Sequence, residues 1–433
     1  MWDICCKVMR TVGNRARSFF VVFPGMVSFL VLVFGSSLAQ DRWESLKSDQ
    51  CVRCHTEDEL LPADLSKEDV HLRPGISCAG CHGGDATAAD GDAAMSRDAG
   101  FVGVPLKRDV PRFCGKCHSD IAVMRRFLPR VATDQVEQYW TSQHGRLLAK
   151  GDKKVADCTS CHTAHGILPA SDSRSAVYPL NVPLTCKRCH GDPEYMKEYG
   201  IAVDQFDKFA RSVHGAALLD RQDTGAPACN DCHGNHGATP PNVTSIAQIC
   251  GQCHANNLQY FSESKMAQPW DREGFHGCEE CHGNHEVEKT FDDMVGTGEK
   301  STCAKCHDEG DAGFETAREI RGLLAGLAKS YDEAESKRLD VHRKGMEDDE
   351  IVFLLQEAHQ DLVRARTLVH TFDPVRVGEK TGEGMGKASR AHEVAVGQMR
   401  EYGIRRLGFG MATVFITLLV VALYLKIRQM ERG

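Results

Sequence analysis

The stretch "CNDCHGNHG" at Cys229–Gly237 holds two cysteines, a histidine directly after the second cysteine, and a further histidine three places later. Near copies occur as "CTSCHTAHG" at Cys158–Gly166 and as "CEECHGNHE" at Cys278–Glu286. The central pattern, Cys-x-x-Cys-His, occurs nine times along the chain, and every cysteine beyond position 6 belongs to one of these motifs. An internal repeat of this pattern therefore dominates the sequence.

Three kinds of site use paired cysteines, and only one of them needs the histidine. Disulfides are plausible in an exported chain, and zinc ribbons also contain Cys-x-x-Cys, but neither requires a histidine after every second cysteine. Covalent c-type haem requires all three residues, because the thiols bond the porphyrin and the imidazole binds the iron. The sequence therefore predicts nine covalently bound haem c groups. The predicted attachment residues are Cys51, Cys54, Cys78, Cys81, Cys114, Cys117, Cys158, Cys161, Cys186, Cys189, Cys229, Cys232, Cys250, Cys253, Cys278, Cys281, Cys303 and Cys306. The predicted proximal iron ligands are His55, His82, His118, His162, His190, His233, His254, His282 and His307.

The composition indicates that haem forms much of the interior. Aromatic residues make up only 7% of the 433 residues, so a core of side chains alone would be thin. Nine haems share a short stretch of chain, too little to wrap each one separately. We expect a mainly α and irregular fold with few strands, in which the haems pack against one another.

Six histidines outside the motifs recur together with the repeat. Low-spin electron-transfer haems usually carry a second axial ligand, and each of three two-motif units between residues 131 and 310 supplies two spare histidines. One spare histidine lies in an "HG" pair before the unit, and the other lies three places after the first motif. We expect each to bind the iron of a neighbouring haem, with the adjacent glycine letting the backbone pass close to a porphyrin. The alternative is a hydrogen bond to a haem propionate. These histidines are His144, His165, His214, His236, His276 and His285, of which His276 departs from the spacing of the others.

The three haems predicted in residues 40–130 have fewer obvious partners. His71 precedes the second motif and is a natural distal ligand for one of them. For two haems the candidates are His359 and His370, which share one face of a predicted helix. A structural role for these two histidines is an equal alternative. Less favoured candidates are His342, His392, Met95 and Met124.

The region after the last motif predicts helices. Apolar residues at helical spacing predict a helical hairpin within residues 311–400. The run "GEKTGEGMG" at residues 378–386 predicts a hinge before a final helix.

Both ends of the chain are apolar. Residues 1–39 have a basic start, an apolar stretch and small residues before a cleavage site, which predicts a signal peptide; an uncleaved anchor is the alternative. The uncharged run Leu407–Leu425 is long enough to cross a bilayer, and basic residues flank it. We expect a transmembrane helix within residues 401–433 with a short cytoplasmic tail. The formal net charge of −8 makes the chain a poor nucleic-acid binder.

The doubled Cys-x-x-Cys-His units with interposed "HG" histidines resemble the multihaem c-type cytochromes of bacteria, of the doubled-CXXCH or cytochrome c3-like type. The resemblance covers roughly residues 45–310. It implies bis-histidine haems, a chain of close haem edges, and periplasmic electron transfer.

Two functions are consistent with this sequence. The favoured one is an electron relay, anchored in the inner membrane with its haem domain in the periplasm. It would connect a membrane complex that oxidises quinol with a periplasmic cytochrome, a terminal reductase or another carrier. The alternative is an oxidoreductase for nitrite, hydroxylamine or tetrathionate at one open haem. All nine motifs end in histidine, and eleven further histidines are enough to cover nine irons, so the relay is favoured and no catalytic residue is assigned. The oligomeric state is open.

Overall fold

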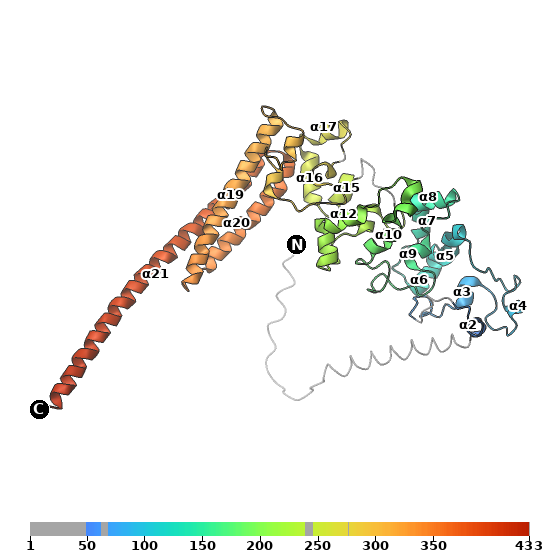
Figure 1. Ribbon diagram of the computed structural model, residues 1–433, viewed down its shortest axis with the longest axis horizontal. Helices are drawn as coiled ribbons and strands as arrows, with labels where there is room; N and C mark the ends of the chain where they lie inside the picture. Colours follow the sequence, from blue (N-terminus) through green and yellow to red (C-terminus); the bar gives the residue numbers. More distant parts are fainter. Residues whose placement is uncertain (1–48, 62–67, 239–245, 276, 433) are drawn as a thin grey trace, which may run out of the picture. The chain divides into compact units, whose positions relative to one another are not determined.

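The computed structural model describes residues 49–61, 68–238, 246–275 and 277–432 (Figure 1). The predicted signal peptide and His276 lie outside these residues. The described chain is mostly helical and has no strand in these ranges, which confirms the predicted fold class. It divides into two compact units, Met1–Tyr178 and Pro179–Gly433, and each is considered separately below.

The first unit consists of short helices joined by turns. Side chains start several of them: Asp120 accepts hydrogen bonds from the backbone N–H groups of Ala122 and Val123, and Ser142 accepts one from Gly145. Helices this short are marginal alone, so they need partners to pack against. The helices are α2 (Gln50–Glu57), α3 (Cys78–His82), α4 (Gly91–Ala94), η1 (Lys107–Asp109), α5 (Val110–His118), α6 (Ile121–Phe127), α7 (Gln135–Thr141), α8 (Gln143–Ala149) and α9 (Cys158–His162).

The first part of the second unit has the same character. Its helices are α10 (Val182–His190), α11 (Pro193–Met196), η2 (Lys197–Tyr199), α12 (Gln205–Arg211), α13 (Val213–Gly215), η3 (Ala216–Asp220), α14 (Cys229–His233), α15 (Ile246–Gly251), α16 (Ala255–Glu263), α17 (Ala267–Arg272), α18 (Glu279–His282), η4 (Asp292–Met294) and η5 (Cys303–Lys305).

The "HG" pairs occupy a repeated helix–serine–helix element. Helix α7 leads into α8 through Ser142, and α12 leads into α13 through Ser212. In each case the serine Oγ accepts a hydrogen bond of 2.9 Å from the glycine N–H of the "HG" pair. A Cβ on Gly145 or Gly215 would overlap a backbone carbonyl of the preceding helix. The preceding helix is therefore what requires glycine at these two positions.

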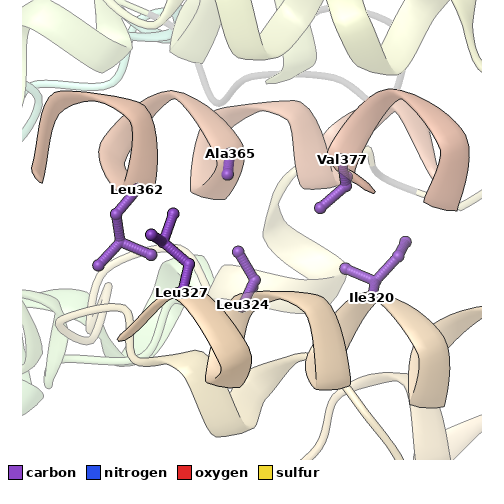
Figure 2. Close-up of a cluster of buried hydrophobic side chains, with 6 residues drawn as sticks. All are labelled: Ile320, Leu324, Leu327, Leu362, Ala365 and Val377. Atoms are coloured by element: carbon purple, nitrogen blue, oxygen red, sulfur yellow. The ribbon is translucent and has the colours of Figure 1, made fainter. Parts of the chain in front are cut away.

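The second unit ends in three long helices, α19 (Ala312–Arg343), α20 (Asp349–Leu368) and α21 (Pro374–Met430), with η6 (Val369–Thr371) between the last two. Helices α19 and α20 form the predicted hairpin, and α21 packs side by side with both of them, so that the three make a bundle (Figure 1). Figure 2 shows one of its two apolar clusters, in which side chains of α19 face those of the other two helices. Each fully buried leucine or isoleucine stabilises the fold by roughly 1.5–3 kcal/mol. This cluster contains Ile320, Leu324, Leu327, Leu362, Ala365 and Val377, and the second contains Ala334, Val341, Ile351, Leu355, Ala391 and Ala395.

The predicted hinge at residues 378–386 is wrong, because these residues continue α21 without a break. The glycines serve packing instead. A Cβ on Gly384 would lie 2.8 Å from a methyl carbon of Leu327 and 3.1 Å from the Cβ of Asp361. Asp361 is buried there, and its carboxylate pairs with Lys387 Nζ at 2.7 Å. Close approach of α21 to α19 and α20 is thus the reason for a small residue at 384.

The last part of α21 carries the apolar run at residues 407–425. Its side chains are exposed in the structure, and its hydropathy is high enough to make it a candidate membrane span. A continuous helix therefore joins the bundle to this segment.

Candidate haem-binding sites

The nine Cys-x-x-Cys-His motifs are numbered here 1 to 9 in chain order. Motifs 3 and 5 lie at the C-terminal ends of α5 and α10, which both begin with valine and proline. Motifs 2, 4 and 6 form five-residue helices of their own, α3, α9 and α14, and motif 8 contains α18. The alternation shows that motifs come in pairs, in which the first has its own helix.

The residue after each even-numbered motif has an unusual backbone. Gly83, Gly234 and Gly283 have positive φ values of 69°, 83° and 74°, and Thr163 takes φ 68° at the equivalent position of motif 4. This conformation ends the motif helix and turns the chain sharply away from the histidine. It is nearly restricted to glycine, so Thr163 is strained.

The attachment cysteines of neighbouring motifs lie close together. In motifs 3, 5 and 7 the first cysteine is within hydrogen-bonding reach of the first cysteine of the next motif. These hydrogen bonds, together with burial, raise the pKa of one thiol of each pair. Motifs 3 and 4, motifs 5 and 6, and motifs 7 and 8 are therefore spatial neighbours. The pairs are Cys114 with Cys158, Cys186 with Cys229, and Cys250 with Cys278, and the pKa is raised for Cys158, Cys186 and Cys278.

Five motif histidines face a spare histidine at a distance that fits an iron. With metal–nitrogen bonds of about 2.0 Å and roughly 1.1 Å from each ring nitrogen to its centroid, two axial imidazoles have centroids about 6.2 Å apart. The observed separations fall between 5.9 and 6.3 Å. The donor set of two thiols and two imidazoles is what haem c with bis-histidine ligation needs. The pairs are His71 with His118 (6.0 Å), His82 with His165 (6.3 Å), His214 with His254 (6.3 Å), His233 with His285 (5.9 Å) and His282 with His370 (6.1 Å).

The pairs follow one rule. The second motif of a unit faces the histidine that precedes the unit's first motif, as His118 faces His71 and His254 faces His214. The first motif faces the histidine that follows the first motif of the next unit, as His82 faces His165. Motifs 2 and 3 therefore form a two-motif unit like the later ones, and motif 1 stands alone.

The C-terminal bundle completes the rule for motif 8. Motif 9 closes this last unit and no further two-motif unit follows it to supply a histidine; the ring opposite His282 is that of His370 in η6. One aromatic contact and one cation–π contact hold this corner against α16: Phe372 packs on Phe261 at 6.4 Å, and Arg376 lies over Tyr260 at 5.4 Å. The bundle therefore contributes to a haem site as well as to stability.

Hydrogen bonds orient four of the site histidines through Nδ1. His82 contacts the carbonyl of Gly103 at 2.9 Å, and His370 contacts that of Thr367 at 2.9 Å. The other two contact carboxylates: His71 contacts Asp69 at 3.0 Å, and His307 contacts Asp311 at 3.1 Å. A ring that donates from Nδ1 presents an unprotonated Nε2, which is the nitrogen that binds iron.

Burial favours the neutral form of four of the facing imidazoles. It lowers the pKa of His214, His282, His285 and His370, and a neighbouring histidine lowers it further. Neutral imidazole is the form that coordinates a metal. Burial works to raise the pKa of Asp69, but the hydrogen bonds from the His71 ring and from two backbone N–H groups outweigh it and lower that pKa.

Three of the candidate distal histidines lie on the bundle, away from the facing pairs. The ring of His359 packs against Tyr331 at 5.7 Å, on the bundle. His342 lies 3.3 Å from Asp348, and His392 lines an open groove of about 600 Å³ on the bundle with Asp292 and Arg321. Within the described ranges, no histidine ring faces His55.

The ligand roles of His144, His236 and His276 stay predictions. His144 lies on α8 and His236 lies after α14. The rule would place His276 opposite His307, but His276 is outside the described residues. Helix α17 precedes the "HG" pair that contains His276, in the same way that α7 and α12 precede the two earlier "HG" pairs.

Sequence reasoning did not identify Asp69 and Asp311. The signal for Asp69 is in the repeat, because serine occupies the equivalent positions 142 and 212, two places before the "HG" histidine. Asp311 is the N-cap of α19, and its carboxylate accepts a hydrogen bond from the Phe314 N–H.

Two protein families match parts of this chain. The family model of cytochrome c3 matches residues 70–191, and the family model of the doubled CXXCH motif matches residues 223–259. No curated protein and no solved structure matches the chain significantly. The two matches, together with the facing histidines, support a multihaem c-type cytochrome with covalently bound haem.

Proposed function

We propose that this chain is a membrane-anchored electron relay with nine haem c groups. Electrons pass along the motifs between a membrane partner and a soluble partner on the exported side. The observation that carries the proposal is the set of five facing histidine pairs, because two protein ligands leave no site on those irons for a substrate.

The chain's own residues define the path. Cysteines of motifs 3 and 4, of motifs 5 and 6, and of motifs 7 and 8 lie next to each other, which supports close spacing of the groups bound there. Haem, once bound, supplies reversible one-electron transfer, and the protein sets its spacing, ligation and solvent exposure. Four Nδ1 hydrogen bonds fix ring orientation, so that the ligands need not rearrange when the charge on the site changes.

The membrane end of the path is the bundle. His370 lies between α20 and α21, and α21 continues into the apolar run. Helix α21 therefore connects the region of His370, the proposed distal ligand of motif 8, to the candidate membrane span without a break. This supports electron exchange near the membrane, with a quinol-oxidising complex as the membrane partner and a periplasmic cytochrome or terminal reductase as the soluble one.

The location follows from the same features. Haem attachment to Cys-x-x-Cys-His, the signal-peptide pattern of residues 1–39 and the basic residues after Leu425 support an inner-membrane protein with its haem domain in the periplasm. In this proposal His236, His144 and His276 are the distal ligands of motifs 4, 5 and 9, so that distal ligands are assigned for motifs 2 to 9.

The test uses purified full-length protein in detergent. A pyridine haemochrome assay should count nine haems per chain. The EPR spectrum of the oxidised protein should be dominated by low-spin haem, and the reduced protein should show little change with carbon monoxide.

Turnover assays separate the relay from an enzyme. A relay should not reduce nitrite or tetrathionate and should not oxidise hydroxylamine. A high-spin haem that binds carbon monoxide, together with turnover of one of these compounds, would replace the relay by the oxidoreductase.

A further inference from the structure

A buried carboxylate contacts one distal histidine. The Oδ1 atom of Asp69 lies 3.0 Å from Nδ1 of His71, and only 8% of the Asp69 side chain is exposed. His71 faces His118, the proximal histidine of motif 3. If Nε2 of His71 binds the iron, Nδ1 carries the ring proton and donates a hydrogen bond to the carboxylate.

Asp69 is held rigidly by two further hydrogen bonds. Its Oδ1 accepts a bond of 2.8 Å from the backbone N–H of His71, and its Oδ2 accepts one of 2.8 Å from the N–H of Ile167. The Val70 N–H in turn donates to the Ile167 carbonyl at 2.9 Å. Ile167 is two residues after His165, the histidine that faces His82. One carboxylate therefore fixes the chain on the distal sides of both motif 2 and motif 3.

The repeat makes Asp69 the exception among equivalent residues. Ser142 and Ser212 occupy the same position relative to their histidines, and each uses its hydroxyl to cap a helix. A hydroxyl carries no charge. A structural cap alone would therefore not require the carboxylate that this unit buries.

The Nδ1 partners of two other site histidines can be compared with that of His71. The neighbouring site in the same unit has a neutral acceptor, the carbonyl of Gly103, on Nδ1 of His82. His307 has a carboxylate, but the Asp311 side chain is 41% exposed, so solvent screens its charge. Only the His71 site, among those with described Nδ1 partners, combines a carboxylate with burial.

We propose that Asp69 is a positioning and tuning residue that gives the motif 3 haem a lower reduction potential than the motif 2 haem. A buried carboxylate on Nδ1 increases the electron donation of imidazole and favours the more positive, ferric iron. Its negative charge acts in the same direction, because charges interact strongly in a low-dielectric site. The inference rests on the proposed relay and gives it a local direction, since electrons pass favourably from motif 3 to motif 2.

The test is a potentiometric titration of the full-length protein, followed by visible and EPR spectroscopy. In Asp69→Asn one midpoint should rise enough to increase the reduced fraction of that haem about tenfold at fixed potential, which is about 59 mV for one electron. The low-spin signal should remain. Asp69→Ser, which introduces the residue of the other units, should give the same upward shift. The matched control is Asp311→Asn, which changes an exposed carboxylate on His307 and should shift one midpoint by less.

A double-mutant cycle ties the effect to His71. In a His71→Met background the ligand has no Nδ1–H, so Asp69→Asn should shift the midpoint clearly less than in the wild type. Unchanged midpoints in both Asp69 variants, with low-spin spectra retained, would overturn the tuning role. Conversion of one haem to high spin in both variants would also overturn it and leave Asp69 with a purely structural role.

Failure of the relay itself would look different. If His71→Met left the spectrum of every haem unchanged, the pairing of His71 with His118 would be wrong, whatever Asp69 does. Both results come from the same spectra, so the two failures are distinguishable.

Discussion

The haem-binding region and the C-terminal bundle are stabilised in opposite ways. Of the 24 buried apolar side chains in the described chain, 15 lie between Ala317 and Ala395, and both apolar clusters are there. The region from Cys51 to His307 is much longer and has only nine. The bundle holds itself together by side-chain packing, whereas the motif region has short helices around paired histidines and cysteines.

This difference shows which region depends on haem. Helices of five residues do not persist alone in water, and few side chains are available to bury them. The bundle needs no cofactor, because its leucines and isoleucines fill the space between three long helices. Among the contacts between the two kinds of structure is that of His370, whose ring the bundle presents to His282 of motif 8.

Removal of haem should separate the two regions most strongly. When the full chain is produced without haem, the amides of α3, α9 and α14 should exchange with solvent rapidly. Those of α19, α20 and the first half of α21 should stay protected. Hydrogen-exchange mass spectrometry measures both at once. Equal protection of the motif helices with and without haem would contradict the dependence on cofactor.

Loss of the bundle's ligand should alter one haem without unfolding the bundle. In His370→Ala the iron held by His282 loses a ligand, so one haem of nine should become high-spin and bind carbon monoxide. His359→Ala is the matched control, because its ring packs on Tyr331, and its haem spectrum should be unchanged. A spectral change in the His359 variant but not in the His370 variant would show that the ligands are assigned the wrong way round.

A methyl group inside the bundle should affect stability but not the haems. In Gly384→Ala the new Cβ would press on Leu327 and Asp361, and we expect a loss of about 1–3 kcal/mol in the free energy of unfolding. Gly382→Ala, on the same helix with no atom within 4 Å, should gain up to about 1 kcal/mol. Denaturation followed by far-UV circular dichroism measures both. A destabilised Gly382 variant would show that α21 is not a regular packed helix here.

The smallest effect should come from the strained turn of motif 4. Thr163 has φ 68° and ψ 172°, a conformation that glycine adopts after motifs 2, 6 and 8. Thr163→Gly should therefore stabilise the haem-binding region by about 1 kcal/mol. Gly234→Thr should destabilise it by a similar amount. Urea unfolding monitored at the haem Soret band compares them, and a destabilised Thr163→Gly would mean that the hydroxyl's hydrogen bonds outweigh the strain.

The sequence was informative where the chemistry is local, and less so where partners are distant. The apolar stripe at Ile320, Leu324 and Leu327 predicted a helix that the structure contains, because helical spacing is a property of neighbouring residues. The glycine run at residues 378–386 was wrongly interpreted as a hinge. Glycine breaks helices in isolation, but here Gly384 allows α21 to approach Leu327, a contact that no local pattern encodes.

The sequence by itself predicted where haem would attach and which histidine would bind each iron from the proximal side. The two cysteines and the histidine are held by one turn of chain, so their chemistry needs no distant contact. Only the tertiary structure decided which spare histidine faces which iron and that Asp69 is buried behind one of them. Asp69 and Ile167 are 98 residues apart, and only folding brings them within 2.8 Å. A distal ligand must approach from the opposite face of the porphyrin, which a nearby residue cannot reach, so this choice depends on how the repeats pack.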